Sequence, residues 1–444
     1  MTVATRWTCL TLAGLALTAA SAVRAEGPAA PTADHLKALL SAEMDRWYPA
    51  AVDPAGGFHQ RIARDWTVMP DRSRSLVYQS RMTWTAAAFA EFEPSRRDEF
   101  LKHARHGLAY LDETMRDAEH GGFHWILGPD GEVDPGLGDE KHVYGAAFAI
   151  YAAAKVRAVA GDDRALTVAR DAFDWLEARA HDPLNGGWFE ATRRDGTAIT
   201  SYDPTAPVAD RKDRLGVYYG YKTMNSHIHI LEALTELARI DDRPIVRKRL
   251  WEAFEIVRDR IAVEPGALNL YLTRDWRPIP AHDSFGHDVE TGFLLVEAAE
   301  ALGIADDSKT WSVARSLIDH ALDWGWDERY GGFNDKGDAF AAGSYDFTKV
   351  WWTQAEGLNA LALMNRWFHS ETDRYARALA EEWRFIETHM LDPDHGGWFA
   401  ETDRDGRLKG DGAKADEWKA NYHTSRAMMH VARALAPAAE HPGK

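Results

Sequence analysis

Three histidines lie in stretches of the sequence whose apolar residues follow helical spacing. They are His229 in KTMNSHIHILEAL (222–234), His287 in SFGHDVETGFLL (284–295) and His423 in EWKANYHTSRAMM (417–429). An imidazole titrates near neutral pH and can act as a general base or a general acid. Histidines on otherwise apolar helices therefore indicate proton-transfer chemistry, provided that the fold brings them together.

Polar residues accompany these histidines at spacings of three or four residues. Asn225, His229 and Glu232 share one face of their predicted helix, whereas His227 points nearly the opposite way. We therefore expect His229 in the functional site and His227 in the wall of the fold. The other predicted stripes are Arg81; Lys141, Tyr144 and Phe148; His287 and Glu290; Lys349, Trp352 and Glu356; and Lys419, His423 and Arg426.

Several kinds of chemistry can be weighed against this set of residues. The histidines come from three separate helices and show no HExxH or shared-face HxH pattern, so we do not predict a metal site. The sequence contains no Walker or Rossmann phosphate loop and no GxSxG nucleophile elbow. Glycoside hydrolysis stays open, because Glu290 and Glu356 could supply its two carboxylates. A sugar-binding protein without turnover is a third possibility.

Proton transfer next to a carbonyl group is the chemistry that uses two or three histidines without a metal. Returning the proton to the opposite face of the same carbon requires two such groups, one on each side. Returning it to the neighbouring carbon on the same face requires only one. Arg81 and Tyr144 could stabilise the enediolate oxygen that forms in either reaction.

A repeat along the chain indicates how these helices are arranged. A Gly-Gly-aromatic turn begins at each of Gly56, Gly121, Gly186, Gly331 and Gly396, with 65 residues between successive turns of the first three and of the last two. The gap of 145 residues after Gly186 leaves room for a degenerate sixth unit near Glu264-Pro-Gly-Ala-Leu-Asn. Glycine supplies the positive φ that such turns need.

Between the turns the hydrophobic pattern is helical, with two helices in each repeat. The predicted helices are 35–48, 77–93, 97–117, 141–160, 163–180, 219–239, 243–262, 285–302, 307–323, 346–368, 372–389 and 418–435. Six helical hairpins of this period predict an all-α fold, an (α/α)6 barrel, in which the second helix of each hairpin lies inside. An open solenoid is the alternative. The segment 201–216, which lengthens one repeat, is a candidate for a lid.

The N-terminal segment and the composition indicate where the protein works. Residues 1–25 combine Arg6, an apolar run and Val23-Arg24-Ala25, which predicts a secretory signal peptide and an exported protein. Cleavage would remove the single cysteine, Cys9. We predict one catalytic domain over 32–436. The net charge of −17 argues against nucleic acid and anionic membranes as partners.

Four motifs resemble those of the N-acylglucosamine 2-epimerase superfamily, and most closely those of its cellobiose 2-epimerases. They are KTMNSHIHILEAL, GHDVE, KVWWTQAE and EWKANYHTSR, and the likeness extends over nearly the whole mature chain. The resemblance implies an (α/α)6 barrel that needs no cofactor. It also implies epimerisation at C2 of a sugar, or aldose–ketose isomerisation, through a cis-enediol intermediate.

The resemblance also implies a role for each residue of the site. His287 and His423 would be the acid/base pair at C2, with Glu290 orienting and tuning His287. His229 would assist ring opening or proton shuttling, with Asn225 beside it. Arg81 and Tyr144 would hold the oxygen at C1 or C2, Trp352 and Trp418 would stack on the sugar, and Glu356 would bind its hydroxyl groups. The expected partner is a small-molecule sugar, and the expected state is a monomer or homodimer.

Overall fold

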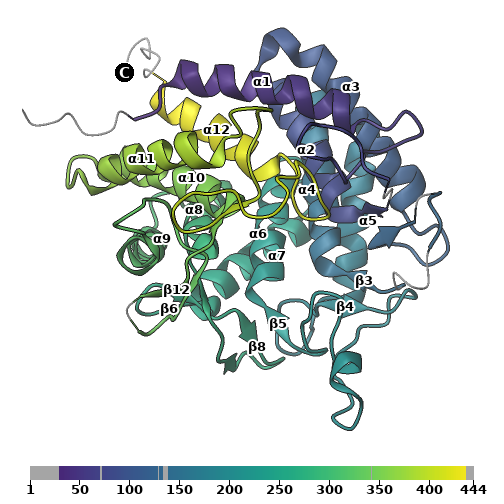
Figure 1. Ribbon diagram of the computed structural model, residues 1–444. Helices are drawn as coiled ribbons and strands as arrows, with labels where there is room; N and C mark the ends of the chain where they lie inside the picture. The colour runs from purple at the N-terminus through teal and green to yellow at the C-terminus, as the bar shows by residue number, and fades with distance from the viewer. Residues whose placement is uncertain (1–29, 71–72, 129, 134–138, 342, 437–444) are drawn as a thin grey trace, which may run out of the picture.

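The protein is described by a computed structural model covering residues 30–70, 73–128, 130–133, 139–341 and 343–436 (Figure 1). The predicted signal peptide, residues 1–25, lies outside these residues. The helices are α1 Ala33–Ala51, α2 Leu76–Phe92, α3 Arg97–Tyr110, α4 Val143–Ala160, α5 Asp163–Arg179, α6 Met224–Ala238, α7 Pro244–Ile256, α8 Phe285–Ala301, α9 Ser308–His320, α10 Trp351–Phe368, α11 Arg374–Phe385 and α12 Tyr422–Leu435.

The even-numbered helices form a closed inner ring. Each contacts the next in the order α2, α4, α6, α8, α10, α12, and α12 contacts α2. The odd-numbered helices surround this ring, and Figure 1 shows the first and last helices, α1 and α12, side by side, in agreement with their contacts. The fold is therefore an (α/α)6 barrel as predicted, and the open solenoid is wrong because the ring closes.

Burial explains which helices lie inside. Nearly every side chain of the inner helix α2 is buried, from Leu76 to Ala90. The outer helix α5 instead buries one stripe, which includes Ala165, Val168, Ala169, Ala172 and Phe173. A helix that is apolar all round must be enclosed, whereas a single stripe needs cover on one side only. Among the described residues, α4 alone is long and apolar enough to span a membrane, and most of it is buried in the barrel.

Short helical turns continue four of the outer helices. The π-helical turns η2 Leu111–Met115, η4 Val257–Ile261, η5 Ala321–Gly325 and η6 Ile386–Met390 extend α3, α7, α9 and α11. The two 3₁₀ turns among the described residues are η1 Pro94–Arg96 and η3 Val208–Arg211. The predicted outer helices, such as 97–117, therefore combine an α-helix and the π turn that follows it. Hydrophobic spacing does not distinguish the two.

Short antiparallel strands gather at the end of the barrel where the inner helices begin, and several of them are labelled in the lower half of Figure 1. They are β1 Arg74–Ser75, β2 Ile126–Leu127, β3 Lys141–His142, β4 Ala191–Thr192, β5 Lys222–Thr223, β6 Ala262–Val263, β7 Ala267–Leu268, β8 Tyr271–Leu272, β9 Pro278–Ile279, β10 Asp283–Ser284, β11 Lys336–Gly337, β12 Ser344–Asp346, β13 Lys349–Val350 and β14 Glu401–Thr402. Most inner helices follow directly on one of these strands, so the strands fix where those helices start.

Four predicted helices start too early. Strands cause three of these errors, since β3, β5 and β13 precede α4, α6 and α10, whereas an irregular segment precedes α12. Lys141 and Lys349 lie in β3 and β13, and Lys419 lies just before α12. Their ammonium groups do not face the barrel axis. Lys349 Nζ donates to the carbonyl oxygen of Gly332 at 2.8 Å and lies 3.6 Å from the Asp327 carboxylate. The prediction that these lysines belong to the polar stripes is therefore wrong.

Most of the Gly-Gly turns hold a base of the following strand in the same way. The aspartate that opens the turn pairs with the base, as in Arg74–Asp53 (2.6 Å), Lys141–Asp117 (2.9 Å) and Lys222–Asp182 (3.1 Å). These bases are buried, so the carboxylate and the turn carbonyls replace the water that they lose. Where a double glycine is present, this buried pair therefore joins the turn after an outer helix to the start of the next inner helix.

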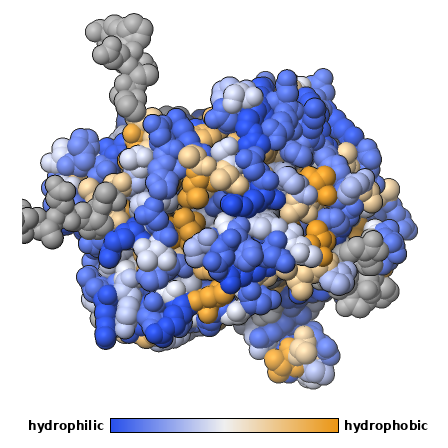
Figure 2. Space-filling model, turned by 45° about the horizontal axis from the view of Figure 1, so that its top comes forward, coloured by the Kyte–Doolittle hydropathy of each residue, from blue (hydrophilic) through white to orange (hydrophobic). Residues whose placement is uncertain are grey.

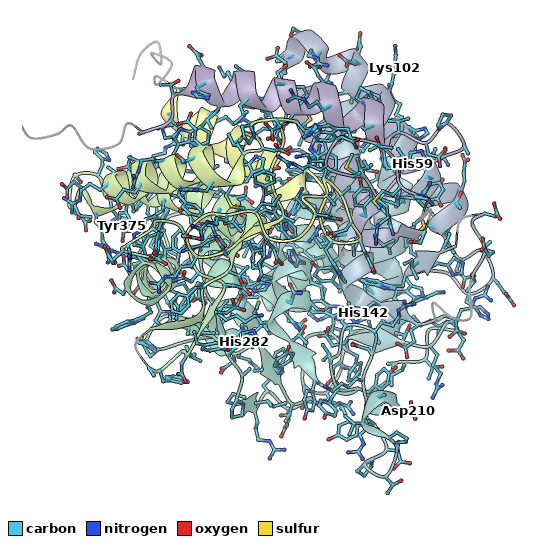
Figure 3. All side chains as sticks on the ribbon, viewed as in Figure 1. His59, Lys102, His142, Asp210, His282 and Tyr375 are labelled. Atoms are coloured by element: carbon cyan, nitrogen blue, oxygen red, sulfur yellow. The ribbon has the colours of Figure 1, made fainter. Side chains whose placement is uncertain are left out.

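The segment 201–216 projects from the strand-bearing end, with Asp210 at its tip in Figure 3 and as the knob at the lower edge of Figure 2. Val208 is 55% exposed at this tip. The base of the segment is anchored, because the Asp213 carboxylate lies 3.0 Å from His142 Nε2. In this structure the segment does not lie across the barrel mouth.

Candidate active site

A cavity of about 340 Å³ opens at the end of the barrel where the inner helices begin. Nine of the ten predicted site residues line it, and Glu356 does not. The histidines stand in the first two turns of α6, α8 and α12, so positions far apart in sequence meet around the axis. The lining residues are Arg81, Tyr144, Asn225, His229, His287, Glu290, Asp335, Val350, Trp351, Trp352, Glu401, Trp418 and His423.

All three histidines are held from behind through Nδ1. The partner of His287 Nδ1 is Ser284 Oγ at 2.7 Å, that of His229 Nδ1 is Glu232 Oε2 at 2.9 Å, and that of His423 Nδ1 is Glu356 Oε1 at 2.7 Å. None of the three Nε2 atoms has a hydrogen-bond partner among the described residues. A ring fixed in this way presents Nε2 to the cavity for proton transfer.

Arg426 organises the carboxylates behind the histidines. Its Nη2 donates to Glu290 Oε1 at 2.6 Å and to Glu356 Oε1 at 2.7 Å, and its Nη1 donates to Glu232 and Tyr422. All these side chains are buried. Burial raises the pKa of Glu290 to about 7, with a further contribution from Glu356. Burial would also raise the pKa of Glu232, but Arg426 and His229 together lower it to about 2.

Two roles implied by the family resemblance differ from the structure. Glu290 does not orient His287, because its carboxylate binds Arg426 while Ser284 holds the His287 ring. Glu356 does not face the cavity to bind hydroxyl groups, because it is fully buried and holds His423. Sequence spacing placed both glutamates on the correct helix face. It did not reveal that the Arg426 guanidinium would bind both carboxylates, with Glu290 at the cavity wall and Glu356 buried beneath it.

Both proposed acid/base histidines have a lowered pKa. Burial lowers the pKa of His287 to about 3, with smaller contributions from the nearby His229 and His282. Burial also lowers the pKa of His423 well below its ordinary value, and the positive charges of Arg81 and Arg426 add to this effect. Neutral imidazoles are the form that can remove a proton from carbon.

An arginine and a tyrosine stand together on the opposite wall. Arg81 Nη2 donates to Tyr144 Oη at 2.9 Å, and Arg81 Nη1 donates to the Trp418 carbonyl oxygen at 2.7 Å. The guanidinium also lies 4.6 Å from the centre of the Phe148 ring. Burial raises the pKa of Tyr144, which keeps its hydroxyl protonated as a donor. This pair can stabilise a negatively charged oxygen inside the cavity.

Two tryptophans supply flat apolar surface. Trp352 lies against both histidines, with its ring centroid 4.7 Å from that of His287 and 5.9 Å from that of His423. Trp418 is 38% exposed at the mouth, where its ring centroid lies 6.2 Å from that of Trp125. Aromatic faces of this kind suit the apolar faces of sugar rings.

His227 and His229 have separate roles, as the helical spacing predicted. His227 is fully buried away from the cavity, where its Nδ1 lies 2.7 Å from the Thr223 carbonyl oxygen and its Nε2 accepts from the Trp188 backbone N–H at 3.2 Å. It therefore ties the start of α6 to a Gly-Gly turn. His229 lines the cavity and packs edge-on against Tyr144, 5.1 Å between ring centroids.

Four polar residues of the site were not predicted. Ser284 lies three residues before His287, so its contact with that ring could have been found from helical spacing. Tyr422 lies beside His423 and contacts Glu232. Asp335 and Glu401 reach the cavity from the segments after two Gly-Gly turns. No periodic pattern marks these last two, because irregular segments carry none.

A second cavity, of about 160 Å³, adjoins the first. The two share Asn225 and His287, and Leu215 and Val217 at the base of the projecting segment line the second. Within the site, Glu290, Glu356 and His423 are close enough to one another to ligate a metal ion. The Arg426 guanidinium already binds both carboxylates, so the positive charge that a metal would provide there is supplied by the chain.

The chain is similar to known proteins over most of its length. A cellobiose 2-epimerase of Bacteroides fragilis is 31% identical over 398 residues, which cover 89% of this chain and 97% of the relative. A D-mannose isomerase of Marinomonas mediterranea is 25% identical over 92% of this chain and 99% of the relative. The structure of cellobiose 2-epimerase from Spirochaeta thermophila superimposes with a TM-score of 0.78 at 32% identity, covering 91% of this chain and 96% of the other.

The family model for N-acylglucosamine 2-epimerase matches residues 56–427, which include every residue of the site described above. The match runs from the first Gly-Gly turn into α12, so it covers nearly the whole barrel. The chain belongs to the N-acylglucosamine 2-epimerase family.

Proposed function

We propose that the protein epimerises a reducing-end aldose at C2, with His287 and His423 as the two proton-transfer groups. The observation that carries this proposal is the arrangement of their rings against Trp352, each fixed through Nδ1 and each presenting Nε2 to the cavity. Two bases on different inner helices can address two faces of one carbon. The relatives named cellobiose 2-epimerase support a disaccharide substrate.

The reaction begins with the open-chain aldehyde of the sugar. Nε2 of one histidine takes the proton from C2, the C–H electrons form the C1–C2 double bond, and the carbonyl electrons move to the C1 oxygen. Arg81 and Tyr144 stabilise the resulting enediolate oxygen. The other histidine, which enters the cycle with a proton on Nε2, gives that proton to the opposite face of C2 as the C1 carbonyl re-forms, so the two rings end with their protonation states exchanged. The two histidines exchange roles for the reverse reaction.

His229 is proposed to assist ring opening, because its Nε2 faces the same cavity beside Tyr144. Opening transfers a proton from the anomeric hydroxyl to the ring oxygen, which one neutral imidazole can mediate. Glu232 holds the ring through Nδ1 and can stabilise the imidazolium that forms transiently. Asn225 lies one helical turn earlier and supplies an amide to the sugar.

Aldose–ketose isomerisation is the second candidate, supported by the D-mannose isomerase relative. It needs one histidine to return the proton to C1 in place of C2. The purified chain should be incubated in D₂O with cellobiose and, separately, with mannose, and the products followed by NMR. Deuterium at C2 of an epimeric disaccharide supports the first proposal, and a ketose supports the second. Absence of both products and of deuterium incorporation would contradict both.

Matched variants separate the histidines. His287→Asn and His423→Asn should each abolish epimerisation. For a given epimer, exchange of solvent deuterium into C2 of the unreacted substrate should survive in at most one of the two variants. His369→Asn, at the exposed end of α10, is the control and should keep wild-type activity. A glycoside hydrolase would instead depend on Glu356, but this carboxylate is buried behind His423 and does not line the cavity.

The location and assembly of the protein are also proposals. The apolar run within residues 1–25 supports export with cleavage after Ala25. Mass spectrometry of the chain from a periplasmic extract tests this, and a chain that retains Met1 to Ala25 would contradict it. We propose a monomer or homodimer that needs no membrane, which light scattering of the mature chain can check.

A further inference from the structure

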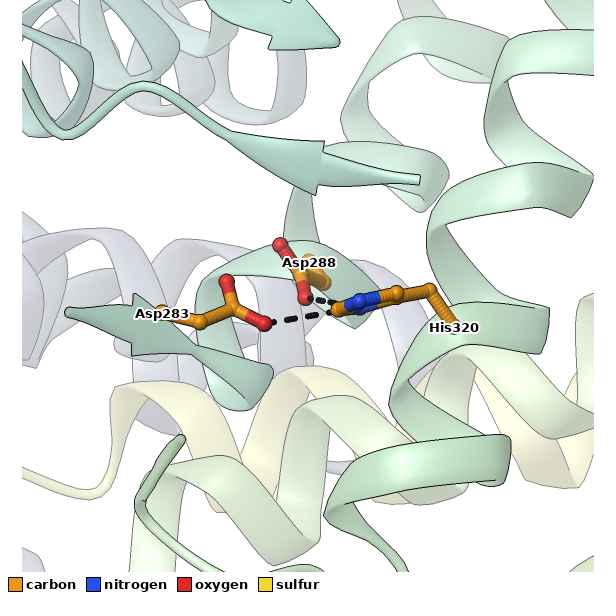
Figure 4. Close-up of side chains that lie close together, drawn as sticks. All are labelled: Asp283, Asp288 and His320. Carbon is orange, nitrogen blue, oxygen red and sulfur yellow. Dashed lines mark ion pairs between the residues drawn. The ribbon is translucent and has the colours of Figure 1, made fainter. Parts of the chain in front are cut away.

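Two aspartates and a histidine converge in the wall of the barrel, outside the active-site cavity. Asp283 comes from β10, Asp288 from the first turn of α8 and His320 from the last residue of α9 (Figure 4). Their exposed fractions are 0%, 0% and 3%. None of them lines either cavity described above. The proposed sugar chemistry therefore does not use them.

Four polar atoms of this cluster have no ordinary partner within the part of the chain that the structure describes, whereas Asp283 Oδ1 accepts from the Ser284 backbone N–H at 2.9 Å. His320 Nδ1 lies 3.4 Å from Asp283 Oδ2 and 3.4 Å from Asp288 Oδ2, which is longer than a good N–H···O hydrogen bond. These three atoms and Asp288 Oδ1 have no hydrogen-bond partner among the described residues. Buried polar groups without a partner are destabilising, so four at one point imply a ligand or a proton shared between them.

Most other hairpins have a base at the position of Asp283. The first residue of the strand before the inner helix is a base in four other hairpins, namely Arg74, Lys141, Lys222 and Lys349. In this hairpin the same position is Asp283. No lysine or arginine in the described part of the chain forms an ion pair or hydrogen bond with Asp283 or Asp288. The hairpin without a double glycine therefore also has an acid at the position where these four hairpins have a base.

His320 replaces an aromatic ring in the same exchange. It is the last residue of α9 before a π turn, a position held by Tyr110 on α3 and Phe385 on α11. Those two rings pack on the Gly56-Gly57 and Gly331-Gly332 turns. Here the ring nitrogen is aimed at two carboxylates instead (Figure 4). This repeat therefore has an aspartate and a histidine at two positions where the repeats named above have bases and aromatic rings.

We propose that Asp283, Asp288 and His320 bind one divalent transition-metal ion, such as Zn²⁺. One imidazole and two carboxylates form a donor set suited to such ions. Tetrahedral ligand atoms about 2.0–2.1 Å from zinc lie roughly 3.3 Å apart. The two Nδ1–Oδ2 separations of 3.4 Å match that spacing. The ion would join β10, α8 and α9, and would fix the turn of α8 that carries His287.

The test measures metal content and thermal stability of the untagged full chain. The protein is stripped with a chelator, exposed separately to Zn²⁺, Mn²⁺ and Mg²⁺, freed of excess metal by gel filtration and analysed by elemental mass spectrometry. We expect about one Zn²⁺ or Mn²⁺ per chain, with a rise in melting temperature, because a ligand that binds only the folded state stabilises it. Retention of Mg²⁺ alone would overturn the assignment of a transition-metal site.

Three variants remove the site in different ways, so that a folding failure in one does not end the test. Asp288→Asn removes a ligand, and His320→Phe restores the aromatic residue of the equivalent positions. Asp283→Lys restores the base of the other hairpins. We expect each to lose metal uptake and the metal-dependent stabilisation.

The control is His423→Asn, which disrupts the other buried cluster of two glutamates and a histidine. It should lose epimerisation yet bind metal as the wild type does, so failure of the proposed function and failure of the metal site are distinguishable. Metal uptake lost in His423→Asn but kept in His320→Phe would overturn the proposal. The proposal would also be overturned if the wild-type protein retained no more metal than His320→Phe. A proton shared between the two aspartates would then explain the unpaired atoms.

Discussion

Glu356 Oε1 lies 2.7 Å from His423 Nδ1, so a carboxylate buried beneath the cavity sets the orientation of a ring that faces the substrate. The same oxygen accepts from Arg426 at 2.7 Å. This arrangement joins α10 and α12, and it makes Glu356 a positioning residue that does not touch substrate. A carboxylate in this place also stabilises the imidazolium that forms when Nε2 takes a proton.

Glu356→Gln tests that relationship. The amide keeps the shape but lacks the charge that stabilises the imidazolium, so kcat should fall by about 10²- to 10³-fold while KM changes little. Steady-state kinetics with cellobiose measures both constants, and circular dichroism confirms the fold. A variant that raised KM with kcat unchanged would instead place Glu356 in contact with the substrate.

The two histidines of α6 should respond differently to substitution. His229→Asn should lower kcat by about 10²-fold with little loss of stability, because its Nε2 acts in the cavity. His227→Ala should keep the active-site geometry but lower the free energy of unfolding by about 1–3 kcal/mol, because it leaves buried backbone groups of Thr223 and Trp188 unpaired. Urea denaturation and an activity assay of both variants check this. Loss of activity in His227→Ala alone would contradict the helix register.

The acid side of the pH profile should reflect the lowered pKa of His423. A base whose pKa is depressed stays unprotonated until the pH falls through that lower value. For the epimer whose C2 proton faces His423, kcat/KM should therefore hold below pH 6.5 and decline only in more acidic solution. The charged or titratable groups near this ring are Glu290, Glu356, Arg81, Arg426, His229 and His287.

Initial rates between pH 4 and 9, with stability confirmed at each pH, measure this profile. Since burial and Arg81 both depress the pKa of His423, Arg81→Gln should move the acid limb toward higher pH. That substitution also removes a donor to the enediolate oxygen and so lowers the rate at every pH. The comparison therefore uses the pH at which the acid limb falls and not the maximum rate. An acid limb at an ordinary histidine pKa in the wild type would contradict the expected depression.

The bases of the Gly-Gly turns should contribute to stability and not to catalysis. Lys349→Met leaves the carbonyl of Gly332 and part of the Asp327 carboxylate without their buried donor, which should lower the free energy of unfolding by about 3 kcal/mol. Lys102→Met is the control, since Lys102 is exposed on an outer helix (Figure 3) and its loss should change stability by less than about 0.5 kcal/mol. Urea denaturation measures both variants. Equal stability of the two would show that the buried pair contributes nothing.

The periodic features of the sequence determined the fold and the face of each helix that carries chemistry. A period of 65 residues with two helical stretches per repeat suffices for six hairpins, and spacings of three and four residues separate His229 from His227. These predictions succeeded because helix geometry relates sequence position to direction locally. The same reasoning could not find the strands before the inner helices, since two residues are too few to show a period.

The tertiary structure alone decided which polar groups meet across helices. Glu290 and Glu356 lie on the predicted face, yet Arg426, from a third helix, binds both carboxylates, and Ser284 holds His287. The convergence of Asp283, Asp288 and His320 is equally absent from any local pattern. Burial makes each charged group depend on its nearest partner in space, and in a closed ring that partner can lie on any neighbouring helix, however distant in sequence.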